Sequence, residues 1–495
     1  MDNLHSKVKA ATKWSTLTEV TAKIISPIIN MILARLLAPE AFGVVASITM
    51  ITSFADIFAD AGFQKYLVQQ EFKTQKDLDD STTVAFWTNL FISVVIYIII
   101  YIFRNQIASL IGNEDLGRGI SVASLVIIMT SFSSIQMARY RRKFDFRTLF
   151  IVRIISSLLP FFITIPLAFL MRNYWALLIG ILTSNLFQAF FLTIRSQWKP
   201  NFYYSLNNLR KMISFSFWSL LEALSIWLTS YMGTFVVGYY LNAYYLGLYK
   251  TSITTVNSYM TIITGSTTSV LFSALSRLKD NKEEYEKTFF KFQRMVAMFV
   301  LPMGVGLFLY RGLATRILLG PKWSEAKDFI GLWAFMSGIS IVFSHYNSEV
   351  FRSKGKPKLS LLSQILHLAV LIPVLMISSR YGFRVLYIAR SLVRLQAILV
   401  GQLILWFNFK ISFIKIVKNV APTIAASFIM GVFSFILRLV SSSIIWEFAS
   451  ILICVLIYFV IILSIPSIGG ELLEIKTIRN VLKRVKFFNK KGRNH

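Results

Sequence analysis

Charged residues are scarce in this sequence: Asp, Glu, Lys and Arg make up only 15% of its 495 residues, against about 25% in soluble domains. That leaves too little polar surface to cover several soluble cores, so a string of water-soluble domains is excluded. Cysteine is almost absent as well. The single one, Cys454, excludes an intrachain disulfide and any cysteine-rich metal site.

Short catalytic motifs are also missing. The sequence has no G-x-x-x-x-G-K-[ST] phosphate loop, no H-E-x-x-H zinc motif and no G-x-S-x-G nucleophile elbow. We therefore expect no ATP hydrolysis by the usual route, no metal site and no cofactor. These absences favour a gradient-driven or facilitated transporter over an enzyme.

Apolar residues are abundant, at 55% of the chain, and the mean hydropathy is +0.62. They fall in runs of about twenty, the length that a helix needs to cross ~30 Å of hydrocarbon. Outer-membrane barrels are excluded because their strands alternate over ~10 residues. The sequence predicts an all-α polytopic membrane protein with about fourteen spans, at residues 14–37, 43–64, 82–103, 119–138, 149–170, 174–194, 213–238, 245–274, 293–310, 328–350, 359–378, 384–406, 417–438 and 445–465.

The basic residues are distributed unevenly between the two sides of the predicted membrane. Lys and Arg total 52 against 23 Asp and Glu; 36 of the 52 fall in the gaps on the side of both termini, 10 in the opposite gaps and 6 inside spans. The positive-inside rule places both termini in the cytoplasm. Anionic lipid attracts such residues by ~1 kcal/mol each, so no nucleic-acid partner is needed to explain the charge. The segment 471–488 has the pattern of a basic amphipathic helix.

A weak internal repeat relates the first and seventh spans. Trp14 and Gly43 recur as Trp218 and Gly247, at a constant offset of 204 residues. A shift by six spans keeps the orientation, so the halves would be parallel repeats about an axis along the membrane normal. We expect two six-helix lobes around a central cavity, followed by two extra helices and a basic cytoplasmic tail. The predicted boundaries are 1–211, 212–407, 408–465 and 466–495.

Polar residues recur at helical spacing on the first, second, seventh and eighth spans. Ionisable groups inside a membrane usually face protein or water, so these stripes are predicted to line the cavity. The alternative is that Ser and Thr bond to their own helix or mediate helix packing. The predicted ion-coupling residues are Glu19, Asp56, Asp60 and Glu222. The predicted substrate-binding residues are Lys23, Asn30, Thr254, Ser258, Arg390 and Arg394.

Four of these charged residues have competing interpretations. Arg390 and Arg394 lie one turn apart in the twelfth span, with Arg394 near its middle. Their planar guanidinium groups suit phosphate oxygens, but they can equally form a structural pair with an acid such as Glu222 or Asp56. Glu19 and Lys23 are spaced to pair at i,i+4, and a permanent pair would only neutralise charge.

Four short segments carry a family resemblance. They are ARLLAPEAFG at residues 34–43, FADAGF at 58–63, LLGPKWSEA at 318–326 and SKGKPK at 353–358. The chain resembles the polysaccharide transporter family, the Wzx-type flippases of lipid-linked oligosaccharides in the MOP (multidrug/oligosaccharidyl-lipid/polysaccharide) superfamily. The resemblance runs over nearly the whole chain and looks nearest to the exporters of colanic and teichuronic acid.

The resemblance implies a flippase of the bacterial inner membrane with a V-shaped pair of lobes. It would move an undecaprenyl-diphosphate-linked oligosaccharide to the outer leaflet by alternating access, beside membrane lipids and glycan polymerase machinery. Family cavities are cationic, whereas the charges that we assign to the interior of the spans are mixed here: Lys23, Arg35, Arg153, Arg390, Arg394 and Arg438 against Glu19, Asp56, Asp60 and Glu222. This mixture keeps a cation-coupled exporter of drugs or other lipids as the alternative, although fourteen spans exceed that branch's twelve. Polymerases and ligases carry a large outward loop, which this sequence lacks.

Overall fold

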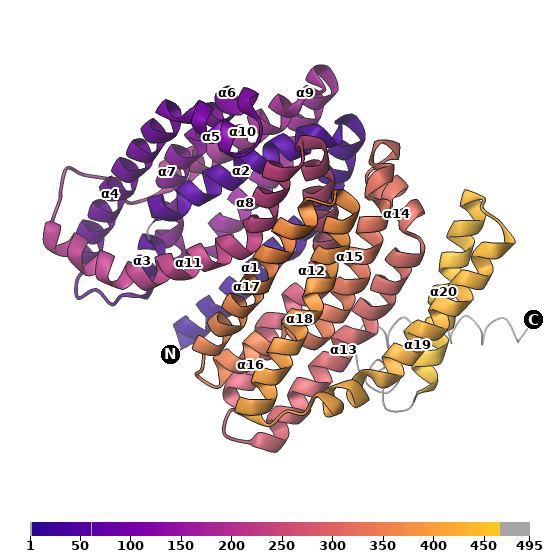
Figure 1. Ribbon diagram of the computed structural model, residues 1–495. Helices are drawn as coiled ribbons and strands as arrows, with labels where there is room; N and C mark the ends of the chain where they lie inside the picture. Colours follow the sequence, from indigo (N-terminus) through magenta and orange to yellow (C-terminus); the bar gives the residue numbers. More distant parts are fainter. Residues whose placement is uncertain (1, 61, 466–495) are drawn as a thin grey trace, which may run out of the picture. The chain divides into compact units, whose positions relative to one another are not determined.

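Helices form nearly all of the secondary structure in the computed structural model, which describes the chain from residue 2 to residue 465 apart from residue 61 (Figure 1). Within that range the description leaves out the side chains of residues 2–13, 16, 19, 20, 214–219, 222, 266 and 269. No strand occurs in the described residues. The predicted amphipathic helix at 471–488 lies outside them.

The first twelve helices are α1 (Asp2–Leu36), α2 (Pro39–Asp60), α3 (Phe63–Gln69), α4 (Gln75–Ile102), α5 (Arg104–Leu110), α6 (Gly117–Ala123), α7 (Leu125–Arg142), α8 (Phe146–Phe162), α9 (Thr164–Met171), α10 (Tyr174–Arg195), α11 (Leu206–Tyr240) and α12 (Ala243–Arg277). The others are α13 (Lys282–Leu309), α14 (Arg311–Leu318), α15 (Lys327–Ser340), α16 (Asn347–Ser353), α17 (Lys358–Ser379), α18 (Phe383–Phe409), α19 (Phe413–Val440) and α20 (Ile444–Ser464). Short 3₁₀ turns at Glu114–Leu116 and Pro321–Ala326 and a π turn at Ile341–His345 complete the set.

Each predicted span falls on one long helix or on consecutive shorter helices. Eleven helical segments of the described chain are long and apolar enough to cross a membrane. Their lengths agree with the predicted polytopic membrane fold, while the count of fourteen spans stays a prediction. One detail differs: the turn between α11 and α12 is only residues 241–242, so Lys250, which we counted among the outward gaps, lies inside α12.

Polar residues at the helix starts determine where several helices begin. Thr74 and Asp77 form a reciprocal capping box at α4, in which each side chain accepts a hydrogen bond from the backbone N–H of the other. Asp145, Asn173 and Asn281 cap α8, α10 and α13 in the same sense. These oxygens satisfy amide groups that a helix start leaves without an intrahelical partner.

The chain divides into two compact units. The first contains residues 1–258, 315–326 and 364–393. Within it α1 packs on α8, α7 packs on α10 and α4, and α2 packs on α11. One apolar cluster of this unit joins α2, α6, α7 and α10 through Ile48, Ile120 and other buried side chains. The lobe boundaries predicted at residues 211 and 407 stay a prediction.

The second unit contains residues 259–314, 327–363 and 394–495. Here α13 packs against α15 and α19, and α19 against α20, with Cys454 and Tyr458 among the buried side chains. The π turn is stabilised by two side-chain amides. Gln293 donates to the carbonyl oxygen of Val342, 3.0 Å away, and Gln402 donates to that of Phe343. These amides satisfy carbonyl groups in a stretch of irregular helix.

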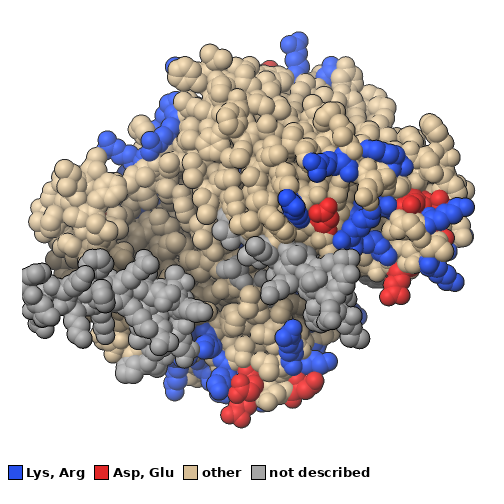
Figure 2. Space-filling view, turned by 180° about the vertical axis from the view of Figure 1, so that it is seen from behind, with Lys and Arg blue, Asp and Glu red and all other residues tan. Residues whose placement is uncertain are grey.

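Large apolar side chains are exposed along several helices. On α20 they recur every fourth residue, with Leu452, Leu456 and Val460 each more than 60% exposed. The face in Figure 2 shows broad uncharged areas, with Lys and Arg gathered into clusters. Exposed apolar patches of this extent mark contact with a membrane or partner, and here the helix lengths favour lipid.

Candidate functional site

Two carboxylates lie one turn apart on α2. The Oδ1 atom of Asp56 accepts a hydrogen bond of 2.6 Å from the hydroxyl of Thr130 on α7. The Oδ1 atom of Asp60 is buried and has no hydrogen-bond partner. None of the ion pairs in the described part of the chain includes either residue. Among the described side chains, neither carboxylate has a positive charge in direct contact.

The predicted residues of α1 are only partly described. Lys23 and Asn30 are half-buried on this helix. The side chains of Glu19 and Glu222 lie outside the described residues, so the pairing of Glu19 with Lys23 and the coupling role of both acids stay predictions.

The structure places Arg390 beside α12. Its Nε donates to the hydroxyl of Tyr249, 3.2 Å away. A Cβ on Gly233 of α11 would overlap that same hydroxyl, so the phenol lies directly against the α11 backbone. The guanidinium is half-buried, and the Tyr249 hydroxyl is one of the groups that orient it.

The two predicted hydroxyl ligands on α12 differ in what they contact. Thr254 is exposed, whereas Ser258 donates to the carbonyl oxygen of Thr254, 2.7 Å away. Ser258 therefore bonds to its own helix, the alternative that the sequence left open.

Arg394 belongs to the second unit, where its guanidinium carbon lies 3.6 Å from the centre of the Trp333 ring. Its NH1 also donates to the hydroxyl of Ser337 at 2.7 Å. A cation held over an aromatic face is stabilised without an acid. Both contacts are with neutral groups of α15, and the predicted role in substrate binding stays a prediction.

Sequence reasoning missed a cation in the first unit. The Lys250 ammonium lies 4.6 Å from the centre of the Tyr231 ring on α11. The signal was present, because Lys250 falls within the polar stripe of α12, but we counted it among the outward gaps.

A pocket of about 240 Å³ lies between α1, α7, α8 and α10. Ser15 and Thr18 of α1 line it, together with Arg141, Arg153 and Gln188. Arg141 donates to the side chain of Gln64 at 3.2 Å, and Arg153 is exposed. Two guanidinium groups with hydroxyl and amide neighbours make this pocket suitable for an anionic, hydroxyl-rich ligand.

Two glycines bring the beginnings of α2 and α12 into backbone contact. A Cβ on Gly43 would overlap the carbonyl oxygen of Ala243 and lie 2.8 Å from the amide nitrogen of Gly247. A Cβ on Gly247 would overlap the carbonyl oxygen of Pro39 and lie 3.2 Å from the amide nitrogen of Gly43. Because Pro39 and Ala243 are also 204 residues apart, the contact is reciprocal, as a two-fold axis between parallel repeats requires. We call these four residues the glycine seam.

Residues 315–326 pack beside the glycine seam. Trp323, which is fully buried, donates its indole N–H to the carbonyl oxygen of Ala34 at 2.7 Å. Arg35 donates to the carbonyl oxygen of Ile317 at 2.7 Å, and the Trp323 ring meets Phe42 edge-on. These contacts join three segments that the charge bias assigns to the outward side.

The comparisons with known proteins agree on one family. The model of a family described as "Polysaccharide biosynthesis protein" matches residues 32–328, more than half of the chain. A Klebsiella pneumoniae protein, "Uncharacterized membrane protein in cps region", is 26% identical over 76% of this chain and 77% of its own length. The Escherichia coli "Lipopolysaccharide biosynthesis protein WzxC" is 20% identical over 87% of this chain and 89% of its own.

The fold also has a solved counterpart. The structure titled "Lipid II flippase MurJ, inward closed conformation" is similar at a TM-score of 0.72. The match covers 90% of this chain and 97% of the other, with 16% sequence identity. At this identity the likeness concerns the fold alone. It confirms the prediction of an all-α polytopic membrane fold.

Proposed function

This chain belongs to the polysaccharide biosynthesis protein family, and we propose that it flips an undecaprenyl-diphosphate-linked oligosaccharide from the cytoplasmic to the outer leaflet. One observation carries the proposal: in a chain of this family, charged and hydroxyl side chains lie on helices that are long enough to span a membrane. Burying such groups in a membrane is costly unless they serve a polar ligand or pathway. The names of its relatives, in capsule-region and lipopolysaccharide biosynthesis, agree with a glycan substrate.

The basic residues supply partners for the diphosphate. Lys23, Arg390 and Arg394 are the proposed contacts, because phosphate oxygens need cationic donors in a medium of low dielectric. The hydrogen bond from Arg390 to Tyr249 supports this role, since it holds the guanidinium in a defined orientation beside α12. Asn30, Thr254 and Ser258 would contact sugar hydroxyls. The pocket beside α1 adds Arg141 and Arg153 to the candidate residues.

Transport proceeds by alternating access in this proposal. The glycine seam supports it, because a backbone contact between α2 and α12 on the predicted outward side closes that route. The seam must separate for a headgroup to leave. Contact through small residues, with no ion pair between α2 and α12 among the described side chains, suits a junction that opens repeatedly.

The acids of α2 are the proposed coupling site. Asp56 and Asp60 bind a proton or a cation in one state and release it in the other, because a ligand shifts a conformational equilibrium only by its differential affinity for the two states. The absence of an ion-pair partner for either residue among the described side chains supports this assignment. Glu19 and Glu222 belong to the same proposed set.

The proposed location is the bacterial inner membrane, with both termini in the cytoplasm. Membrane lipids surround the protein, and a glycan polymerase acts on the flipped product. No cofactor, metal or nucleic acid takes part.

Flipping in reconstituted vesicles tests the proposal. The purified protein is placed in liposomes with a fluorescent undecaprenyl-diphosphate oligosaccharide, and an impermeant quencher reports how much reaches the far leaflet. We expect protein-dependent flipping that Arg390→Ala lowers and Arg384→Ala, an exposed arginine of the same helix, leaves unchanged. If the wild-type protein does not flip this substrate and instead exports a lipophilic cation, that result would establish the alternative, a cation-coupled exporter.

A further inference from the structure

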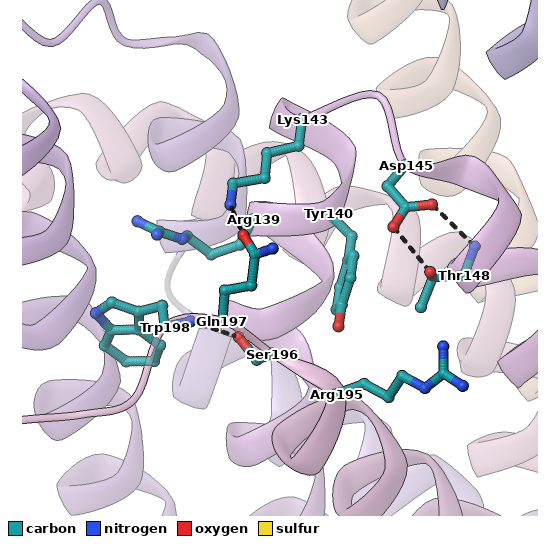
Figure 3. Close-up of a pocket in the computed structure, with 9 residues that line it drawn as sticks. All are labelled: Arg139, Tyr140, Lys143, Asp145, Thr148, Arg195, Ser196, Gln197 and Trp198. Carbon is teal, nitrogen blue, oxygen red and sulfur yellow. Dashed lines mark hydrogen bonds between the residues drawn. The ribbon is translucent and has the colours of Figure 1, made fainter.

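A second pocket lies at the predicted cytoplasmic ends of α7 and α10, next to the beginning of α8 (Figure 3). Its volume is about 200 Å³, and its walls come from residues 139–148 and 195–198. All of them belong to the first unit. The proposed transport function uses none of these side chains.

Arg139 forms one wall, and its charge is already compensated. Its guanidinium pairs with Asp79 and donates to the hydroxyl of Thr82 at 3.3 Å. The ring of Trp198 lies 5.9 Å from the guanidinium carbon. Arg139 is only 6% exposed. It therefore fixes the shape of the pocket and contributes little net charge to it.

Three other groups face the pocket with unused donors. The hydroxyl of Tyr140 is buried and has no hydrogen-bond partner. The guanidinium carbon of Arg195 lies 5.6 Å from the centre of the Phe191 ring, and Arg195 has no ion-pair partner among the described residues. Lys143 gives one hydrogen bond of 2.7 Å to the side-chain oxygen of Gln197, so two of its ammonium protons remain. Figure 3 shows the Tyr140 hydroxyl directed toward the side of the pocket that Arg195 occupies.

Asp145, the acid that lines the pocket, already accepts hydrogen bonds from within the protein. The two oxygens of Asp145 accept from the backbone N–H and the hydroxyl of Thr148, at 3.1 and 2.8 Å. Asp145 thus caps α8 and makes no ion pair with Lys143 or Arg195 in the described structure. The space between these groups is left with an excess of donors and of positive charge.

We propose that this pocket binds the phosphate of an anionic phospholipid headgroup from the cytoplasmic leaflet. Lys and Arg with a free hydroxyl are phosphate partners, and basic pockets between the cytoplasmic ends of membrane helices are suited to anionic lipid headgroups. A buried hydroxyl without a partner is costly, and a phosphate oxygen would satisfy Tyr140.

An exposed apolar stripe favours a lipid as the source of the phosphate. Leu186, Phe190 and Ile194 share one face of α10 and are 54%, 64% and 58% exposed. The stripe ends next to Arg195, so a headgroup in the pocket leaves its acyl chains along α10. The lipid would hold the ends of α7, α8 and α10 together. This inference rests on the predicted membrane orientation and does not depend on which substrate is flipped.

Thermal unfolding of the purified full-length protein in an uncharged detergent tests the site. Phosphatidylglycerol and phosphatidylcholine are titrated separately, because a ligand that binds only the folded state raises the unfolding temperature increasingly as its concentration exceeds its Kd. Tyr140→Phe is the sharpest variant, since its hydroxyl has no protein partner to lose. Arg195→Gln removes the uncompensated charge. Arg147→Gln, an exposed neighbour that does not line the pocket, is the matched control.

We expect phosphatidylglycerol, but not phosphatidylcholine, to stabilise the wild-type protein. Tyr140→Phe and Arg195→Gln should each weaken the apparent affinity for phosphatidylglycerol about tenfold, because each removes one charge-assisted hydrogen bond. Without added lipid, Tyr140→Phe should unfold at the wild-type temperature or above. If the Tyr140 hydroxyl had a purely structural role, its removal would lower the unfolding temperature instead. Equal stabilisation by phosphatidylcholine, or equal weakening by Arg147→Gln, would overturn the site. Tighter binding of a polyprenyl diphosphate or of inorganic phosphate through the same residues would overturn the phospholipid as its occupant.

Discussion

Replacing Gly43 by alanine should open the predicted outward side. The added methyl would overlap backbone atoms of Ala243 and lie 2.8 Å from the amide nitrogen of Gly247, and backbone cannot rotate away as a flexible side chain can. Overpacking of this kind costs about 1–3 kcal/mol. This cost falls only on the state in which the glycine seam is closed, so the ratio of closed to open protein should fall roughly 5- to 150-fold.

Labelling of a buried cysteine measures that ratio. Ala34 is fully buried, and its carbonyl oxygen accepts the hydrogen bond from Trp323 beside the glycine seam. In a Cys454→Ser background, Ala34→Cys should react slowly with an impermeant maleimide added outside. Adding Gly43→Ala should raise the rate by the same 5- to 150-fold, because the rate follows the open population.

Gly306→Ala is the matched control. A Cβ at Gly306 meets no atom within 4 Å, so this variant gains the same helix propensity without a clash. Equal labelling rates for Gly43→Ala and Gly306→Ala would refute the argument. Gly247→Ala should act like Gly43→Ala, and the two together should be less than additive, because both disrupt one contact.

Three further predictions concern the site and the orientation. Arg390→Ala should lower flipping at least about tenfold at unchanged protein level, because a charge-assisted hydrogen bond contributes about 1.5–3 kcal/mol, whereas equal loss in Arg384→Ala would point to a general charge effect. Asp56→Asn should make the flipping rate insensitive to an imposed proton or sodium gradient; a gradient response equal to that of wild type would exclude Asp56 as the coupling residue. Cysteines introduced at 278–290 should react only from the cytoplasmic side, and labelling from outside would reverse the predicted orientation.

The polar residues show what sequence patterns can predict, which is their position, and what they cannot, which is their contact partners. The acids of α2 were found from spacing alone, because ions in an apolar run stand out in one dimension. Their contacts were not: Thr130, which donates to Asp56, lies on a helix distant in the sequence. Arg394 was weighed between a phosphate and an acid, and the structure adds contacts with Trp333 and Ser337 that neither interpretation contained.

The sequence by itself determined the class of protein and the family, and it predicted the sides of the membrane, because these depend on local quantities. A run of apolar residues, a count of Lys and Arg in short gaps and a few contiguous motifs need no knowledge of packing. The offset between Gly43 and Gly247 was also visible from the sequence alone, because the two glycines lie in similar sequence contexts.

Only the tertiary structure decided which of these residues meet. The glycine seam exists because the two helices cross at the glycines themselves, and the pocket around Tyr140 exists because α7 and α10 end side by side. Both depend on how each helix is rotated about its own axis, where one residue changes the direction of a side chain by about 100°. Hydropathy predicts that a helix is buried in the membrane, but packing against its neighbours selects its rotation, and with it the partner of every polar side chain.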